Sequence, residues 1–482
     1  MFALSSDVSA SVVVFLVALP LCVGVAVASG VPAELGLVTG IVGGLVTGLL
    51  PGSSLQVSGP AAGLTVLVAE AVRSYGLAAL GLIVVATGLL QLLLGVLRLG
   101  RWFRAISLSV VEGMLAGIGL VIIAGQLFAM ADRPAPPTGP DKLLGLPALA
   151  AAVIASPGAR TAFCLGAGVI AVIVAWPYLP EVVRTVPGAL VGVGLAVVAT
   201  QMLDLPVETV KISGILEAVT TPDFTLLPSL PALFLVGTIT AFTLIASAES
   251  LFSAAAVDRL HNGPRTDFDK ELIAQGAGNT VSGLLGALPL TAVIVRSSAN
   301  VRAGARTKVS RVLHGVWLLL FVMLLPGVLA MIPVAALAGV LVHAGVKLLP
   351  VKQFVPLWRR HRGEALVLLA TALGVLGVGM FEGVLIGLGL SVVKTAWDTS
   401  RVKIETVGIR PDELTVKISG NATFLNLPRL LDALEALPSG CPIRLDMTDL
   451  RHRDHACTMA LLSWVERRDG QDVTLVQLTP SL

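Results

Sequence analysis

Long apolar stretches separated by short polar ones run through most of the chain. About 20 apolar residues are needed for one helix to cross the hydrocarbon core of a membrane. The pattern predicts fourteen membrane segments, near residues 8–28, 34–50, 60–73, 77–97, 106–128, 160–176, 186–203, 230–257, 271–287, 291–303, 312–331, 334–349, 364–380 and 382–397. Residues 142–156 predict one more short helix outside this count. The expected fold over residues 1–398 is therefore a polytopic, all-α membrane domain.

The pattern changes near residue 399. From Arg401 onward charged residues are frequent, and short stretches alternate between apolar and polar positions. This predicts a small α/β domain over residues 399–482, with strands at 414–418, 443–447 and 473–478 and helices at 427–437 and 455–467.

The charges predict the orientation in the membrane. Only 13% of the residues are charged, against about 25% in soluble proteins. Basic residues gather in four loops, at 98–104, 259–270, 302–311 and 352–362. With fourteen segments, these loops and both termini lie on one side, which the positive-inside rule makes the cytoplasm. We therefore expect a multi-pass protein of the cell's inner (plasma) membrane with cytoplasmic N- and C-termini.

Two of the predicted segments are short and begin with turn residues. Gln56–Pro60 precedes the helix near 60–73, and Gly286–Pro289 precedes the helix near 291–303. They are the third segments of two successive sets of seven, and they run in opposite directions. This arrangement is typical of an inverted 7+7 repeat, here about 1–205 and 228–398, whose two half-helices meet at mid-membrane. The alternative is that each turn is only a kink with packing glycines.

The meeting point of two half-helices favours an anion. A helix N-terminus carries roughly half a positive charge and free N–H groups. Two of them facing one another predict an anion site that needs no fixed cation. Gly59 allows a close approach at this point, and Arg296 in the second half-helix adds positive potential.

Several motifs resemble the sulfate permease (SulP) family of anion transporters, in its prokaryotic form with a short C-terminal STAS domain. They are Asp7-Val8, Ala18–Leu21, Gln56–Pro60, Glu249–Leu251 and Asn300–Thr307. The resemblance implies the 7+7 inverted topology, a core domain that moves against a gate domain, a cytoplasmic STAS domain and a homodimer. It also implies sulfate, bicarbonate, chloride or dicarboxylates as substrates.

The resemblance also implies a set of site residues. Family members line the site with the first span and with the starts of the third and tenth spans. At the matching positions this chain has small or apolar residues: Leu21, Val25, Ala61, Ala62, Thr291, Ala292 and Val293. Backbone dipoles are therefore expected to be the main ligands of the anion.

Glu249 is the one acidic residue between Asp223 and Asp258, in the predicted eighth span. A carboxylate at this depth is costly unless it is paired or protonated. In the family fold this span adjoins the site, so we expect Glu249 to lie near Arg296. It is either a proton-coupling residue or half of a fixed ion pair. Relatives that use sodium place an acid one turn later, where this chain has Ser253, so a proton is favoured over sodium.

The expected function is secondary active transport of a small anion, namely bicarbonate, sulfate or a dicarboxylate such as fumarate, by proton symport and alternating access. The alternatives are an anion channel or exchanger of the same fold and, less favoured, a nucleobase transporter. We expect no enzyme activity, cofactor, metal, disulfide or nucleic-acid partner, since no nucleophile–base pair, metal-ligand cluster or phosphate loop is present in the sequence. The expected partners are the anion, H⁺ and the lipid bilayer.

Overall fold

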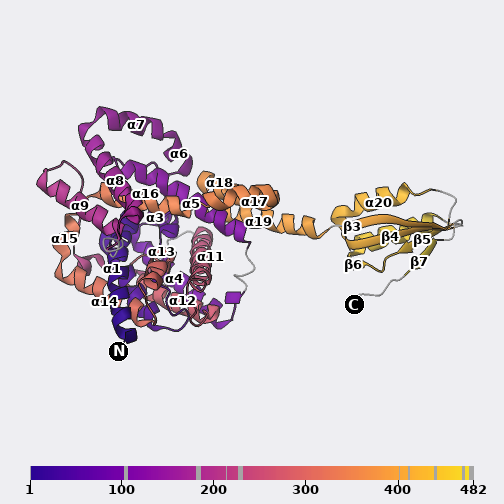
Figure 1. Cartoon of the computed structure of the whole chain (residues 1–482), viewed down its shortest axis with the longest axis horizontal. Helices are drawn as coiled ribbons and strands as arrows, with labels where there is room; N and C mark the ends of the chain where they lie inside the picture. Colours follow the sequence, from indigo (N-terminus) through magenta and orange to yellow (C-terminus); the bar gives the residue numbers. More distant parts are fainter. Residues whose placement is uncertain are drawn as a thin grey trace. The chain divides into compact units, whose positions relative to one another are not determined.

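The structure is a computed structural model, and it describes residues 2–101, 107–180, 186–212, 214–225, 232–400, 402–410, 413–438, 442–468 and 473–476. The chain divides into two compact units, Met1–Gly387 and Leu388–Leu482. The first is helical, and the second is built mainly of strands and two helices (Figure 1).

Every predicted membrane segment contains a helix in the structure. In chain order the helices at these positions are α1 (Phe2–Ala28), α2 (Ala33–Val42), α3 (Thr65–Tyr75), α4 (Leu77–Val96), α5 (Leu108–Ala129), α8 (Pro157–Ala175), α9 (Gly188–Met202), α11 (Ala232–Val257), α12 (Phe268–Leu284), α13 (Ile294–Arg302), α14 (Val309–Leu324), α16 (Val334–Leu348), α18 (Arg362–Gly377) and α19 (Met380–Thr399). The helices between them are α6 (Gly139–Leu144), α7 (Leu146–Ala155), α10 (Ile215–Ala218), α15 (Pro326–Ala330) and α17 (Val351–Arg360).

Fewer of these helices have the length of a full span than the sequence pattern suggests. Within the described residues, seven helices are long and apolar enough to cross a membrane, including α1, α4, α5 and α11. Others are apolar but short, among them the continuous run Ala33–Thr47, of which Gly43–Thr47 is a π-helix, η1. Some of the fourteen predicted segments are therefore too short to cross the membrane alone as straight helices.

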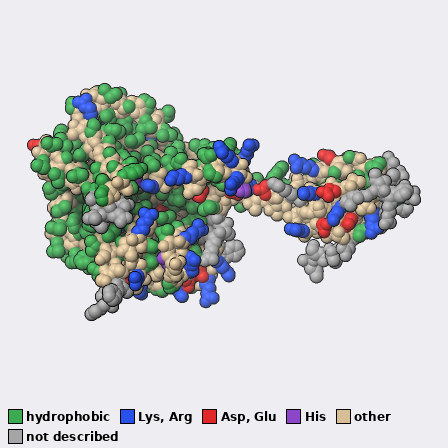
Figure 2. Space-filling model, viewed as in Figure 1, with side chains coloured by type: hydrophobic (Ala, Val, Ile, Leu, Met, Phe, Trp, Pro, Cys, Tyr) green, Lys and Arg blue, Asp and Glu red, His purple; other side chains and the backbone are tan. Residues whose placement is uncertain are grey.

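The surface of the helical unit suits a lipid environment. Hydrophobic side chains cover most of the upper and left part of the helical unit in Figure 2, and Lys and Arg are more frequent toward its lower and right parts. Large apolar side chains that would be unusual on a soluble protein are exposed on several helices, such as Leu93 and Val96 on α4 and Leu195 and Val198 on α9. The helical unit is therefore that of a multi-pass membrane protein.

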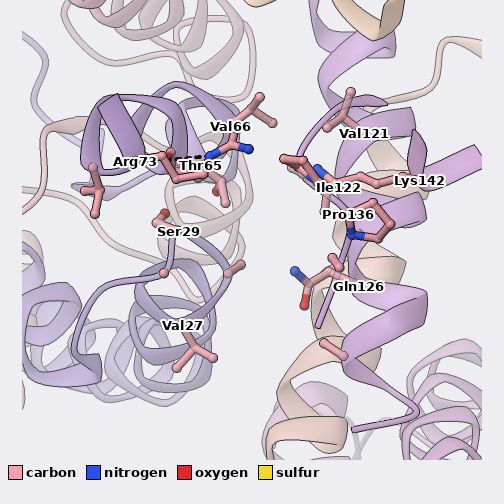
Figure 3. A pocket seen from close by; sticks show the side chains of 18 residues that line it. Val27, Ser29, Thr65, Val66, Arg73, Val121, Ile122, Gln126, Pro136 and Lys142 are labelled. Carbon is pink, nitrogen blue, oxygen red and sulfur yellow. Dashed lines mark hydrogen bonds between the residues drawn. The ribbon is translucent and has the colours of Figure 1, made fainter. Parts of the chain in front are cut away.

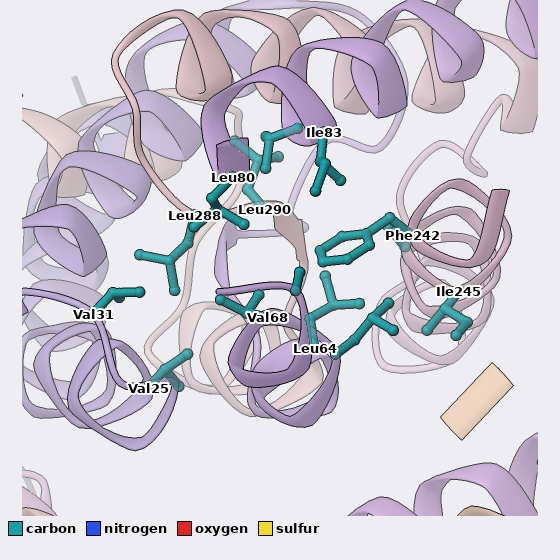
Figure 4. Packing of buried hydrophobic residues seen from close by; sticks show 14 of the residues in the cluster. Val25, Val31, Leu64, Val68, Leu80, Ile83, Phe242, Ile245, Leu288 and Leu290 are labelled. Carbon is teal, nitrogen blue, oxygen red and sulfur yellow. The ribbon is translucent and has the colours of Figure 1, made fainter. Parts of the chain in front are cut away.

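Close helix packing uses glycine. Helices α4 and α12 lie against one another, and a methyl group at Gly276 would stand 2.6 Å from the backbone nitrogen of Leu92. Only a residue without a side chain allows two backbones to come this close. Beside this pair, side chains of α1, α3, α4 and α11 and of the strand around Leu290 turn toward one another in one hydrophobic cluster (Figure 4).

The second unit is a small α/β domain. Its sheet has the order β3 (Val402–Arg410), β4 (Glu413–Ala422), β5 (Ile443–Asp446), β7 (Val473–Val476), with β6 (Leu450–Arg453) beside β4. Strand β3 is antiparallel to β4, and the other pairings are parallel. Two helices, α20 (Leu427–Glu435) and α21 (His455–Arg467), contribute Leu434, Leu461 and Trp464 to its core.

The sequence pattern predicted both helices and the strands β4, β5 and β7 of this domain. Of the predicted strand 473–478, residues 477 and 478 lie outside the described residues. Strands β3 and β6 were missed. The four residues of β6, Leu450–Arg453, include two arginines and a histidine and are largely solvent-facing, so they lack the apolar alternation by which strands are found.

Asp454 links the start of α21 to the segment that precedes α20. Its carboxylate accepts hydrogen bonds from the backbone nitrogens of Cys457, at 2.8 Å, and Phe424. Partial burial opposes ionisation, but these hydrogen bonds to the charged form outweigh it and lower the pKa of Asp454 below its usual value. Asp454 is thus the N-cap of α21 and also holds the segment that leads into α20.

We predict that Asp454→Ala destabilises α21 by about 1 kcal/mol, the usual cost of losing an N-cap. Amide exchange in α21 of the full chain, followed by mass spectrometry, should become about fivefold faster. Because the folded-state pKa lies below the unfolded one, the carboxylate stabilises the domain above the unfolded pKa of about 3.9. The difference between variant and parent should therefore shrink as the pH falls through the folded-state pKa.

Asp449→Ala is the matched control. Asp449 pairs with Lys417 at 2.6 Å, but the two side chains are 57% and 35% exposed. An exposed pair contributes little. Equal effects of the two substitutions on exchange in α21 would contradict the capping role.

Candidate functional site

Two short strands from distant parts of the sequence pair inside the helical unit, at a place that we call the strand crossing. Strand β1 (Ser58–Pro60) pairs antiparallel with β2 (Leu290–Ala292), and Gly59 lies opposite Thr291. The pairing continues with a hydrogen bond from the nitrogen of Val293 to the oxygen of Val57, at 2.9 Å. Residues more than two hundred positions apart are thus joined by backbone contacts.

Each strand leads directly into a short helix. Beyond β1 come the 3₁₀ turn η2 (Ala62–Leu64) and α3, and beyond β2 comes α13. Neither start is capped by a side chain: Ala61, before η2, and Val293, before α13, have none that accepts a hydrogen bond. Because the strands are antiparallel, the two helices begin at the same crossing and leave it with opposite chain directions.

The helices begin later than the sequence predicts. Pro60 and Thr291 were expected as first helical residues, but both lie in strands, and the helices start at Ala62 and Ile294. The residue before a proline avoids the helical region, which keeps Gly59 extended. Pro60 has no N–H to donate to its strand partner Leu290. The Asn279 side chain satisfies Leu290 instead: it accepts from the nitrogen of Leu290 at 2.7 Å and donates to the oxygen of Leu290 at 3.0 Å.

A buried polar network holds the crossing in place. Asn279 of α12 also donates to the Gln91 side chain of α4, at 2.7 Å, and Gln91 donates to the hydroxyl of Ser247 on α11. The hydroxyl of Ser250, also on α11, accepts from the nitrogen of Ala292 at 3.2 Å. Since each of these polar groups is buried and bonded, the network determines where the two strands lie. Ser250 belongs to the Glu249–Leu251 motif noted in the sequence, whereas Asn279 was missed, although a polar residue in an apolar helix is a usable signal.

Arg296 is buried beside the crossing without an acidic partner. Its side chain is fully shielded from solvent. One guanidinium nitrogen, Nη2, donates to the oxygen of Pro60 at 3.3 Å, whereas Nε and Nη1 have no hydrogen-bond partner. The thiol of Cys22 on α1 lies next to it. In the described part of the chain it forms no ion pair. A buried cation with free donors is costly unless an anion joins it.

Glu249 lies next to the same crossing. Its side chain faces the hydroxyl of Thr291, and a methyl group on Gly63 would stand 2.8 Å from each carboxylate oxygen. Its Oε2 is buried and has no hydrogen-bond partner. The expected pairing with Arg296 is not formed: among the described residues no ion pair joins them. Arg296 reaches Gly59 and Pro60, whereas Glu249 approaches Gly63 and Thr291 from α11.

The other predicted residues converge on the same place. Val25 of α1 belongs to the hydrophobic cluster at the crossing, and Leu21 and Ala62 pack against that cluster. Thr291 and Ala292 are buried in β2, and Ala61 is 2% exposed. Val293, between β2 and α13, is half-buried. The crossing therefore combines apolar walls, uncapped helix starts and one cation, which is an arrangement able to receive a small anion.

Comparisons with known proteins show the family of this chain. The sulfate permease family matches residues 4–371, and the STAS domain family described with Mlab matches residues 405–482. YvdB of Bacillus subtilis, named as a candidate sulfate transporter, is 28% identical over 394 residues, which are 80% of this chain and 72% of that protein. The bicarbonate transporter BicA of a Picosynechococcus species is 27% identical over 363 residues, 71% of this chain and 61% of that protein.

Two solved structures share the fold. The transmembrane domain of a cyanobacterium bicarbonate transporter BicA superposes with a TM-score of 0.68 and 23% identity, over 81% of this chain and 97% of that one. The murine Solute Carrier 26 family member A9 anion transporter in the inward-facing state has a TM-score of 0.79 and 15% identity, over 98% of this chain and 86% of that one.

We predict that Gly59→Ala destabilises the crossing, because a methyl group there would collide with the Arg296 guanidinium. Overpacking of this kind typically costs about 1–3 kcal/mol. The thermal unfolding midpoint of the purified protein should fall measurably. Gly194→Ala on α9, where an added methyl group meets nothing within 4 Å, is the control and should leave the midpoint unchanged or raise it. Equal midpoints for both variants would contradict the close contact at Gly59.

Proposed function

The chain belongs to the sulfate permease family, and we propose that it is a secondary active transporter that carries a small anion by alternating access. The single observation that supports this most is the fully buried Arg296, with two free guanidinium nitrogens, beside two uncapped helix starts. An anion at this point would receive charge-assisted hydrogen bonds from both sources.

The proposal includes an inverted repeat of fourteen membrane segments. Seven segments lie in about 1–205 and seven in 228–398, and the STAS domain comprises 399–482. A helix at every predicted position supports it, and so does the antiparallel pairing of the third segment's approach with that of the tenth. Short helices such as α3 and α13 then reach only mid-membrane. We place both termini in the cytoplasm, the protein in the inner membrane, and two copies in a dimer.

For the substrate we propose a compact anion such as sulfate or bicarbonate. Proteins named as transporters of these two anions align with most of this chain. The walls at Leu21, Val25 and Ala62 have no hydrogen-bonding side chains, so recognition falls to backbone N–H groups and Arg296. A dicarboxylate such as fumarate carries two charged groups and would need donors at both ends, which makes it the less suited member of the class.

For coupling we propose that Glu249 takes up a proton during the cycle. Its carboxylate is buried next to the crossing, and Oε2 has no partner there. Protonation removes a negative charge near the anion, so anion binding and proton binding favour one another. Ser253, which occupies the position of a sodium-type acid one turn later, argues for H⁺ rather than Na⁺.

We predict that Glu249→Gln keeps sulfate or bicarbonate uptake in proteoliposomes but loses its acceleration by an inward pH gradient. The amide resembles the protonated carboxyl in shape and cannot release a proton. Glu112→Gln on α5, a carboxylate away from the crossing, should keep the acceleration. Unchanged pH dependence in Glu249→Gln would assign the coupling elsewhere, and a voltage-driven current without proton flux in the parent protein would favour the channel alternative.

We predict that Arg296→Gln weakens anion affinity at least about tenfold, which corresponds to about 1.4 kcal/mol of lost charge-assisted hydrogen bonding. Isothermal titration of the purified protein with sulfate and with bicarbonate measures this. Arg296→Lys keeps the charge with fewer donors, so its anion affinity should lie between those of the parent protein and Arg296→Gln. Full affinity in a folded Arg296→Gln protein would remove Arg296 from the site.

We predict that Ala61→Trp and Val293→Trp abolish uptake, because either indole would fill the space between the two helix starts. Val198→Trp on α9 is the control, since Val198 is 51% exposed on the apolar surface and its substitution should leave uptake intact. Size-exclusion profiles verify folding. Normal uptake by both folded crossing variants would show that the anion passes elsewhere.

A further inference from the structure

A second candidate site is a cavity of about 390 Å³ that lies along α3, between this helix and the C-terminal parts of α1 and α5. Part of the segment after α5, together with α6, closes it on one side. Its lining residues include Arg73 of α3 and Lys142 of α6 but no acidic residue. Figure 3 shows these two side chains reaching into the cavity from opposite walls.

Neither cation is neutralised within the described residues. The Nε of Arg73 donates to the oxygen of Ala69 at 3.3 Å, and neither Arg73 nor Lys142 forms an ion pair there. Burial and the nearby Arg73 guanidinium lower the pKa of Lys142. Glu70 interacts electrostatically with Arg73 but, among the described residues, forms no ion pair with it, and its side chain lines a different cavity together with Glu382. Two like charges therefore face one another across a hollow.

The cavity also offers neutral donors. Gln126 of α5 lines it, and the Thr65 hydroxyl, which lines it at the start of α3, is buried without a hydrogen-bond partner. Thr65 and Arg73 are separated by about 12 Å along the helix at 1.5 Å per residue. Since α3 begins at the strand crossing, the lining extends from the neighbourhood of the crossing toward the end of the helix.

We propose that Arg73 and Lys142 bind a small oxyanion between them, as an outer anion site distinct from the one at the crossing. The anion would neutralise two cations that otherwise repel one another. The inference rests on the proposed function only in placing this cavity on the anion's path; anion binding by the two cations stands without transport. By the orientation proposed above, the site faces the outside of the cell.

The test measures charge in the cavity directly. Val66, half-buried, lines the cavity between Thr65 and Arg73. Val66→Cys in the full chain, in vesicles of phosphatidylcholine alone, is labelled from outside with an anionic and a cationic methanethiosulfonate reagent, and modification at residue 66 is followed by mass spectrometry. The measured quantity is the ratio of the labelling rate with the anionic reagent to that with the cationic reagent. This ratio should be at least about tenfold higher in Val66→Cys than in Val66→Cys combined with Arg73→Gln and Lys142→Gln. Sulfate should slow the reaction only where both cations remain.

Arg160→Gln is the matched control, since Arg160 is an exposed cation at the start of α8 that does not line this cavity. It should leave both the reagent preference and the sulfate protection unchanged. Where Val66→Cys lowers the yield of folded protein, the half-saturating external sulfate concentration for uptake serves instead. It should rise at least about fivefold in the double Gln variant and stay near the parent value in Lys142→Arg.

Equal labelling by both reagents, or protection by sulfate that survives removal of both cations, overturns the outer site. Absence of protection in phosphatidylcholine vesicles, with a reagent preference that changes only on adding phosphatidylglycerol, also overturns it in favour of a lipid headgroup. Charge-selective labelling and sulfate protection without any sulfate uptake would keep the outer site and refute the proposed transport. Sulfate uptake without charge-selective labelling would refute the outer site and keep the proposed transport.

Discussion

The need to satisfy backbone hydrogen bonds inside an apolar unit governs the centre of this protein. Where α3 and α13 begin, neither helix can supply hydrogen-bond partners for the backbone groups of the residues that precede it. The short pairing of Ser58–Pro60 with Leu290–Ala292 supplies them for both at once. Because the two strands come from segments more than two hundred residues apart, their pairing joins distant parts of the chain and places the two uncapped helix starts together.

The buried charges of the helical unit divide into satisfied and unsatisfied ones. Asp7, 1% exposed, accepts from the backbone nitrogens of Arg306 and Thr307 and from the Thr307 hydroxyl. Glu271 accepts from the nitrogen of Ser53 at 2.8 Å and from two glutamine side chains. These carboxylates hold loops in place. Arg296 and Glu249, by contrast, keep polar atoms without partners at the crossing among the described residues, so these atoms are available to bond a ligand.

This contrast also sorts the motifs that carry the family resemblance. The Asp7-Val8 motif and the Asn300–Thr307 motif contact one another, since Asp7 binds the end of the latter, and Asn300 donates to the oxygen of Leu55 at 2.9 Å. They support the approach to the crossing and need not touch an anion. The motifs Gln56–Pro60 and Glu249–Leu251 form or face the crossing itself. Two of the family's motifs thus support the structure around the crossing, and two others lie at the candidate site.

The sequence alone determined the class of protein, the position of a helix in each predicted membrane segment and the α/β domain, because apolar periodicity and turn residues are local signals. Through its resemblance to the family, the sequence also indicated residues that meet at the crossing. It placed the helix starts at Pro60 and Thr291 several residues too early, since strand pairing between distant segments leaves no local trace. It expected Glu249 beside Arg296, but among the described residues no ion pair joins them: the guanidinium donates to Pro60, while Thr291 and Gly63 adjoin the carboxylate. The cavity between Arg73 and Lys142 was likewise decided by packing, because residues 69 positions apart come together only when α3, α5 and α6 have assembled.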